Sequence, residues 1–364
     1  MTPCQEFPYV PGPWRPAAPA RAPERDSPTA SRSARMPVSG KPAASPTTAT
    51  AAPPLSLAVL GLGVFLLVLA PLLAWYVTPR AKATPVEVEV TTVFTGDGSY
   101  FDTAALKTRD HRRITISRHV LGDVAASEKS GRAVWDVSTT VDTPQTLALK
   151  DPRRAFQWTT ERWVTDRHSN APVHCCGEAP TRFDGDAYLK FPFDVRKTGY
   201  RWWDNTLGAA VPLRFAGTRA VQGFQGYRFT GTVPPTRTGS RQVPGRLVGR
   251  PEQGQIQAEE WYANSGVELV VEPHTGRIMD AVISPVKTLR APGARRTAVT
   301  LLRGERLRFT PATQRAQVRL AKADRDKLVL VGRTLPVTAG AAGAVLVPAG
   351  VVWVVRGRRA TGRS

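Results

Sequence analysis

Two stretches decide the architecture of this chain: LSLAVLGLGVFLLVLAPLLAWYV at Leu55–Val77 and LPVTAGAAGAVLVPAGVVWVV at Leu335–Val355. Neither stretch contains a charged residue. A helix rises ~1.5 Å per residue, so about 20 apolar residues cross a hydrocarbon core of ~30 Å. We therefore predict transmembrane helices at residues 54–78 and 334–355.

Details of each stretch support this prediction. Pro71 is tolerated in a membrane helix, and Trp75 and Tyr76 lie where aromatic rings favour the headgroup level. The second stretch is rich in Ala and Gly. Such small residues allow two helices in a membrane to approach each other closely.

The basic residues beside the two stretches indicate the orientation. Several arginines precede the first stretch, and four follow the second without an acidic residue among them, whereas only Arg80 and Lys82 follow the first stretch directly. The positive-inside rule then places both termini in the cytoplasm and residues 79–333 outside the plasma membrane. The first stretch is too long for a cleaved signal peptide and fits a signal anchor better.

Composition describes the two ends of the chain. Residues 1–53 are rich in Pro, Ala, Ser and Thr, so we expect a disordered cytoplasmic leader. Either Met1 or Met36 fits as the start of translation. Residues 356–364 form a short basic cytoplasmic tail.

The net charge of +21 raises the question of nucleic-acid binding. We reject nucleic acid as a partner, because the basic middle segment is expected outside the cytoplasm. Anionic lipid headgroups or acidic envelope polymers are better partners for a basic exterior. The alternative is an arginine-rich composition that serves no specific partner.

Strand patterns dominate residues 79–310. Val86–Val90 alternates apolar and acidic residues, as a strand with one buried face does. Thr95–Gly98 predicts a turn, Ala187–Phe191 predicts a short strand, and Pro273–Gly276 predicts a hairpin loop. We predict a mainly β extracytoplasmic domain, built as a large curved antiparallel sheet or a barrel-like sheet, between the two transmembrane helices.

One helix is expected outside the membrane. Thr310 followed by Pro311 is a helix start with an N-cap and a first-turn proline. We predict a membrane-proximal helix over residues 311–333 that continues into the second span.

Cys175 and Cys176 are adjacent and lie in the sequence His174-Cys-Cys-Gly-Glu178. Thiols outside the cytoplasm tend to oxidise, and a disulfide between these two neighbours is the leading hypothesis. Pairing between chains or two reduced thiols remain open. Adjacent ligands suit tetrahedral zinc poorly, so we predict no metal site.

The sequence contains few signs of catalysis. None of the five histidines lies in a hydrolase or metalloprotease motif, and Gly96-Asp-Gly98 lacks the strand-to-helix context of a phosphate-binding loop. We therefore predict that the protein is not an enzyme and has no cofactor.

Tryptophans are the most informative candidates for ligand contact. Six of them fall on or beside predicted strands, where large rings either fill a core or line an apolar cavity that holds a lipid-like ligand. They are Trp135, Trp158, Trp163, Trp202, Trp203 and Trp261.

Several of these segments resemble the porin PorA family of actinobacterial membrane proteins, whose domain has no known function. The resemblance rests on VWDVSTTVDT at 134–143, the Cys-Cys-Gly-Glu block, KFPFD at 190–194 and EWYAN at 260–264, and it covers about residues 55–355. The family label implies a channel. An outer-membrane barrel, however, needs an apolar outer face and no long apolar helices, so the two stretches argue against that form of pore.

A weaker similarity is to the class B scavenger receptors, which have two terminal spans and a β-rich ectodomain with a lipid tunnel. Glu272–Gly276 is the segment that carries it. Our leading hypothesis is an envelope membrane protein whose β domain binds or conveys a lipid-like ligand. A scaffold that binds a protein or wall polymer is the alternative, and an oligomeric channel is the third. Whether the chain forms a homo-oligomer is left open.

Overall fold

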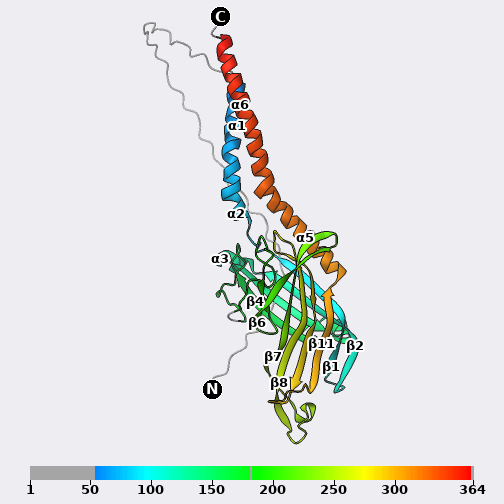
Figure 1. Cartoon of the computed structure of the whole chain (residues 1–364). Helices are drawn as coiled ribbons and strands as arrows, with labels where there is room; N and C mark the ends of the chain where they lie inside the picture. Colours follow the sequence, from blue (N-terminus) through cyan, green and yellow to red (C-terminus); the bar gives the residue numbers. More distant parts are fainter. Residues whose placement is uncertain (1–53, 181–182, 362–364) are drawn as a thin grey trace, which may run out of the picture. The chain divides into compact units, whose positions relative to one another are not determined.

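A computed structural model describes residues 54–180 and 183–361. It consists mainly of one antiparallel sheet, with a long apolar helix before it and another after it (Figure 1). The predicted fold class, a β domain between two long apolar helices, is confirmed. The predicted leader and both candidate start residues lie outside the described residues.

The two helical rods are each continuous. The first comprises α1 (Pro54–Leu72), a π-helical turn (Leu73–Val77) and α2 (Thr78–Ala81). The second comprises α5 (Pro311–Val329), a π-helical turn (Leu330–Thr334) and α6 (Leu335–Thr361). Segments of both rods, Leu55–Ala81 and Pro311–Gly357, are long and apolar enough to cross a membrane.

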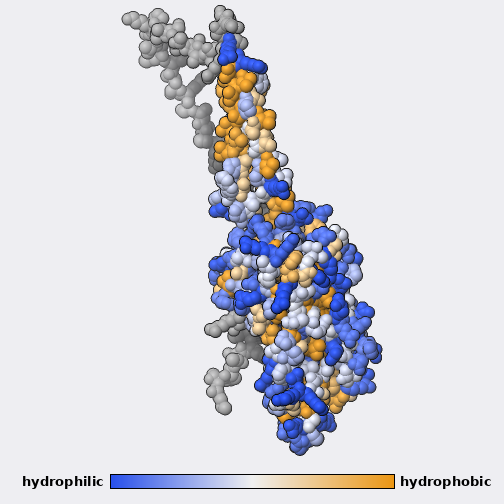
Figure 2. All heavy atoms as spheres, in the orientation of Figure 1, coloured by the Kyte–Doolittle hydropathy of each residue, from blue (hydrophilic) through white to orange (hydrophobic). Residues whose placement is uncertain are grey.

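Small residues bring α1 and α6 into close contact, as the sequence suggested (Figure 1). A Cβ atom on Gly343 would lie 2.8 Å from the Gly63 carbonyl oxygen, and one on Gly350 would lie 2.9 Å from the Leu60 Cα. Any side chain at these positions would push the helices apart. The spans therefore form a packed pair, and apolar side chains cover the pair on the face seen in Figure 2.

The start of α5 is fastened to the sheet. Thr310 caps the helix, because its Oγ1 accepts a hydrogen bond from the Thr313 amide at 3.2 Å. Asp280 of the sheet is fully buried and accepts hydrogen bonds from Arg308 and from Gln314 of α5, both at 3.0 Å. This buried carboxylate ties the membrane-proximal helix to the β domain.

The strand order across the sheet is β4-β3-β2-β1-β11-β10-β8-β7-β6-β5, and β9 pairs with β8 and β11. The strands are β1 (Glu89–Asp102), β2 (Lys107–Gly122), β3 (Ala133–Asp142), β4 (Gln157–Thr165), β5 (Tyr200–Asp204), β6 (Ala209–Val221), β7 (Phe224–Pro244), β8 (Gln255–Val271), β9 (Ile278–Ile283), β10 (Pro285–Arg290) and β11 (Val299–Phe309). Two short helices, α3 (Val124–Ser130) and α4 (Pro144–Leu149), flank β3.

The predicted turn at Thr95–Gly98 is wrong, because these residues lie inside the continuous strand β1. Their glycines serve close strand packing. A Cβ on Gly98 would lie 2.1 Å from the Arg303 carbonyl oxygen, and one on Gly96 would lie 2.9 Å from the Leu307 side chain. The chain reverses only after Asp102, where β1 ends.

A long irregular connection lies between β4 and β5, the strands at the two ends of the strand order; the structure describes it over residues 166–180 and 183–199. Ala179 exchanges two main-chain hydrogen bonds with Arg162 of β4, and Ala187 accepts one from Trp203 of β5. We call these described residues the closing segment, because they bond to both edges. The predicted strand at Ala187–Phe191 is wrong: these residues form only isolated bridges, from Ala187 to Trp202 and from Lys190 to Arg277.

Candidate ligand-binding site

A cavity of about 310 Å³ lies where the sheet meets α2 and α5. Its lining includes Ala81 at the end of α2 and Leu328 near the end of α5. We call it the stalk cavity. Its volume is at the lower end of the range typical of small-ligand sites.

Strand periodicity gives the stalk cavity much of its apolar wall. Val88, Val90, Thr92 and Phe94 line it, whereas Thr91 between them is exposed on the other face of the sheet. Successive side chains of a strand point to opposite faces, so every second residue of β1 lies on the cavity side. The alternation seen in the sequence therefore continues into the cavity wall.

A tight turn holds the closing segment against the same cavity. The buried Glu272 carboxylate accepts hydrogen bonds from the amides of His274 and Thr275, at 3.0 and 2.6 Å. Gly276 follows with φ of +73°, and a Cβ there would lie 2.1 Å from the Phe191 carbonyl oxygen. The Phe191 amide donates to the Gly276 carbonyl at 2.8 Å. Glycine is therefore required where the two segments meet.

Lys190 is placed by this contact and lines the stalk cavity. Its Nζ donates to Thr84 Oγ1 at 3.1 Å and lies 3.5 Å from the Phe193 ring centroid. Burial and, to a smaller extent, the charge of nearby Arg277 lower the pKa of Lys190 to about 7, against the opposing charge of Asp324. At neutral pH this ammonium group thus gives up its proton far more readily than an ordinary lysine.

Further charges surround Lys190. Arg277 faces it directly across an antiparallel bridge, and Arg277 Nη2 forms an ion pair with Asp324 of α5 at 2.7 Å. Lys327 of α5 and Arg118 of β2 also line the cavity. The lining carries four basic side chains and the single carboxylate of Asp324, which Arg277 already engages.

A second cavity, of about 690 Å³, lies farther along the sheet and is lined by strands and the residues before β4. We call it the sheet cavity. Its wall is more polar: Lys287 Nζ donates to Gln157 Oε1 at 2.6 Å, and Arg241 pairs with Glu260 at 2.5 Å. Burial lowers the pKa of Lys287 to about 8.

Two buried carboxylates stabilise the wall of the sheet cavity. Glu161 accepts hydrogen bonds from the Trp163 indole and the Tyr188 hydroxyl, at 2.7 and 2.8 Å. Asp204 accepts one from the Tyr262 hydroxyl at 2.8 Å. Burial raises the pKa of the Asp204 carboxyl, and the hydrogen bond from Tyr262 partly opposes this rise. Both carboxylates link the edge strands to buried aromatic rings.

The two cavities share a wall. Phe94, Arg118, Tyr188, Trp202 and Ile283 line both of them. Trp202 Nε1 donates to the Tyr188 carbonyl oxygen at 3.1 Å, and the Arg118 guanidinium lies 5.1 Å from the Tyr188 ring centroid. The two cavities are therefore neighbours, and β5 and the closing segment hold two of the shared residues together.

The structure brings three of the six candidate tryptophans to the cavities. Trp135 and Trp202 line the stalk cavity, and Trp202 and Trp261 line the sheet cavity. Trp261 also stacks with Arg290, whose guanidinium lies 3.9 Å from its ring.

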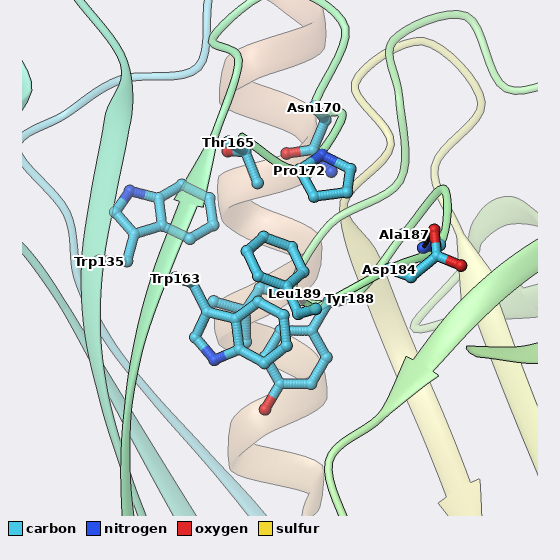
Figure 3. Close-up of a pocket in the computed structure, with 11 residues that line it drawn as sticks. Trp135, Trp163, Thr165, Asn170, Pro172, Asp184, Ala187, Tyr188 and Leu189 are labelled. Carbon is cyan, nitrogen blue, oxygen red and sulfur yellow. Dashed lines mark hydrogen bonds between the residues drawn. The ribbon is translucent and has the colours of Figure 1, made fainter. Parts of the chain in front are cut away.

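The other three tryptophans lie elsewhere. Trp163 is buried and stacks on Tyr188 with ring centroids 3.8 Å apart, so little space remains beside it (Figure 3). Trp203 is buried in the same aromatic cluster. Trp158 is 45% exposed and donates its indole N–H to Ser138 Oγ at 2.9 Å. Neither Trp163, Trp203 nor Trp158 lines the stalk or sheet cavity.

Cys175 and Cys176 form a disulfide in the closing segment. The Cys176 carbonyl accepts a hydrogen bond from Arg162 of β4 at 3.0 Å. His174 contacts the Glu178 carboxylate, with Nδ1 2.9 Å from Oε2. The disulfide therefore lies in the part of the closing segment that bonds to the edge of the sheet.

The sequence did not predict the basic side chains that line the stalk cavity. Lys190 stands alone among apolar residues in the run Tyr188-Leu-Lys-Phe-Pro-Phe193, and a lone charge in such a run was the available signal. Nothing local indicates its position opposite Arg277, because the two residues are brought together by the closing segment and the 272–276 turn.

Comparison with known proteins gives the family. The family model described as Porin PorA matches residues 55–352, which include the whole sheet and most of both apolar helices. No curated protein matches the chain, so the similarity to class B scavenger receptors has no support. The chain is a membrane protein that belongs to the Porin PorA family.

Proposed function

We propose that the protein binds a lipid-like ligand in the stalk cavity and that it acts by binding rather than by catalysis. One observation carries the proposal: this apolar cavity is lined by the interior of the sheet, by Ala81 at the end of the first helical rod, and by residues of α5, the part of the second rod that precedes α6. A lipid tail that leaves the bilayer there passes from one apolar environment to another.

The chemistry of the lining supports an apolar occupant. Phe94, Trp202, Leu269 and Phe309 contribute large apolar surfaces to the cavity. Burial of an acyl chain against them is favoured by about 25 cal/mol per Å² of apolar surface removed from water. The aromatic rings are held in fixed positions by strands, so the cavity is largely formed before a ligand arrives.

The shared wall supports transfer between the two cavities. A ligand in the stalk cavity is separated from the larger sheet cavity by Arg118, Tyr188 and Trp202. Arg118 is half-buried, so its rotation is fast compared with backbone rearrangement, whereas Tyr188 and Trp202 are buried. Part of the proposal is therefore that the ligand extends past these side chains and that the domain conveys it away from the membrane.

The orientation is also part of the proposal. The basic residues beyond α6 and before α1 favour cytoplasmic ends, which place the β domain on the outer side of the plasma membrane. Anionic lipids of that membrane, or an anionic envelope polymer, would meet a strongly basic domain.

The test is lipid co-purification with the intact chain, measured by native mass spectrometry after extraction in a mild detergent. Val90→Trp places a large ring in the stalk cavity, whereas Thr91→Trp places the same ring on the outer face of β1. We expect the wild type and Thr91→Trp to retain bound lipid and Val90→Trp to lose it. Equal retention by all three proteins would overturn the proposal.

The family name favours a channel as a second candidate function. The sheet surface seen in Figure 2 is largely hydrophilic, and the apolar surface there is concentrated on the helix pair. A channel of this chain would therefore have to form from several copies of the helix pair. Single-channel conductance of purified protein in planar bilayers tests this candidate, and a steady conductance that Val90→Trp leaves unchanged would favour it over lipid binding.

A further inference from the structure

We propose that Lys190 and Arg277 form a subsite for an acidic headgroup, so that the ligand of the stalk cavity is an anionic amphiphile. This inference rests on the proposed lipid-binding function and adds the charge of the ligand to it. It concerns a phosphate or carboxylate group that is attached to an acyl chain.

The first argument is the arrangement of like charges. Lys190 and Arg277 are partners in an antiparallel bridge, where directly opposite side chains approach each other closely. Two cations in that position repel each other. Asp324 neutralises Arg277 through contacts of 2.7 and 3.2 Å, but it forms no ion pair with Lys190. An anion between the two basic groups removes the repulsion.

The second argument is the incomplete hydrogen bonding of the ammonium group. A lysine ammonium has three N–H donors. In the described part of the chain, Thr84 Oγ1 is the one hydrogen-bond acceptor recorded for Lys190 Nζ, and the Phe193 ring occupies a second side. Because Lys190 lines the cavity, its ammonium group suits an oxygen of an acidic group there, since a bond between two charged partners is stronger than one between neutral groups.

The third argument is the balance of charge around the site. Arg118 from β2 and Lys327 from α5 face the same space, so basic groups come from four separate parts of the chain. The lowered pKa of Lys190 agrees with this geometry, because burial and a neighbouring cation are its causes. An anionic ligand reverses the second cause and favours the charged lysine.

The position of the subsite gives the ligand a direction. Thr84 follows the end of the first rod by three residues, and Asp324 and Lys327 precede the second span. The headgroup would therefore lie near the membrane end of the cavity, while Trp202 and Phe94 contact the acyl chain at the shared wall.

Quenching of tryptophan fluorescence by brominated acyl chains tests the inference on the full chain in nanodiscs of zwitterionic lipid. Trp75→Phe and Trp353→Phe remove the rings on the membrane helices, which bulk lipid would quench. A small fraction of brominated phosphatidylglycerol or brominated phosphatidylcholine is then added. We expect roughly tenfold tighter binding of the anionic lipid, as one charge-assisted contact provides.

Three variants assign the preference to Lys190. Lys190→Met should reduce the roughly tenfold preference to about one, and Lys190→Arg should keep it. Lys322→Met is the matched control, because Lys322 is an exposed lysine of α5 outside the cavity lining. A preference that survives Lys190→Met, or one that Lys322→Met also removes, would overturn the subsite.

The outcomes separate this inference from the function on which it rests. Equal quenching by both brominated lipids in the wild type would overturn the anionic subsite and leave lipid binding intact. No quenching by either lipid would overturn both. Excess inorganic phosphate should not relieve the quenching, because it has no acyl chain; full relief would show that the site binds a free anion rather than an amphiphile.

Discussion

The indole rings of Trp163 and Trp203 lie with their centroids 5.9 Å apart, although their strands, β4 and β5, occupy opposite ends of the strand order. Tyr188 of the closing segment stacks on Trp163 at 3.8 Å (Figure 3). The two edges of the sheet therefore meet through aromatic packing, and Tyr188 of this cluster also lines both cavities.

Removal of Trp163 should loosen this closure. Trp163→Ala is expected to lower the free energy of unfolding by about 3–5 kcal/mol, because it leaves a large cavity in a buried aromatic cluster. Urea titration in detergent, monitored by circular dichroism, measures this free energy of unfolding. Trp158→Ala on the same strand should cost only about 1 kcal/mol, since that ring is exposed and makes one hydrogen bond. Equal losses of stability in Trp163→Ala and Trp158→Ala would contradict the role of Trp163 in joining the two edges of the sheet.

Lys190 should make stability depend on pH. Its pKa is about 7 in the folded protein and 10.5 ordinarily, so the unfolded chain binds more protons between these values. Stability then rises with pH across this window, and the cost of holding the charged lysine is greatest below about pH 7. Lys190→Met should therefore be more stable than the wild type below about pH 7, and the two should converge towards about pH 10.5. A difference in stability between Lys190→Met and the wild type that does not change with pH would contradict the lowered pKa of Lys190.

Binding of the anionic lipid should also depend on pH. The bound headgroup favours the charged lysine, so binding takes up a proton above about pH 7 and the affinity falls as pH rises further. Phosphatidylglycerol suits this measurement, because the charge of its phosphodiester stays constant over that range. The quenching assay should show this fall in the wild type and little change in Lys190→Arg, whose guanidinium remains charged. The same slope in both proteins would point to another titrating group.

Cys175 and Cys176 should be protected from alkylation until a reductant is added. In a Cys4→Ser background, intact mass should show no alkyl group before reduction and two after it. The closed loop is very short, so replacement of both cysteines by serine should cost only about 1 kcal/mol of stability. Two alkylatable thiols in untreated protein would refute the disulfide.

The helix pair should be sensitive to side-chain size at one glycine and tolerant at another. A Cβ on Gly343 lies 2.8 Å from the Gly63 carbonyl oxygen, whereas a Cβ on Gly61 has no atom within 4 Å. Gly343→Leu should therefore cost about 1–3 kcal/mol in unfolding titrations with SDS in mixed micelles, and Gly61→Leu should cost little. Similar behaviour of the two variants would mean that α1 and α6 do not pack in this way.

Local patterns predicted an element correctly where its signal depends only on residues next to each other in the chain. Thr310-Pro311 marked the start of α5 in this way. The alternation at Val86–Val90 predicted a strand that begins too early, because β1 starts at Glu89 and residues 86–88 precede it. Gly96 and Gly98 misled the prediction, because glycine favours both a turn and a close approach of another strand. Only the position of β11 beside β1 distinguishes these two uses.

The candidate site was also only partly predictable from local sequence patterns. The sequence predicts six tryptophans on or beside strands, where a ring either fills a core or lines a cavity. Trp135, Trp202 and Trp261 line a cavity, whereas Trp163 and Trp203 are buried in the aromatic cluster and Trp158 is exposed. Strand membership alone does not separate these tryptophans. The face that each ring occupies depends on the register of its strand and on what covers that face.

The sequence by itself determined the two apolar helices, the strand-rich domain between them and the helix that leads into the second span, because each follows from length and periodicity along the chain. Only the tertiary structure decided that the closing segment joins β4 to β5 and that Lys190 faces Arg277 inside a cavity. The physical reason is that these contacts join residues that lie far apart in the sequence, and their energy depends on how completely the surrounding fold buries them from water. A local sequence pattern predicts neither the partner of such a residue nor its burial.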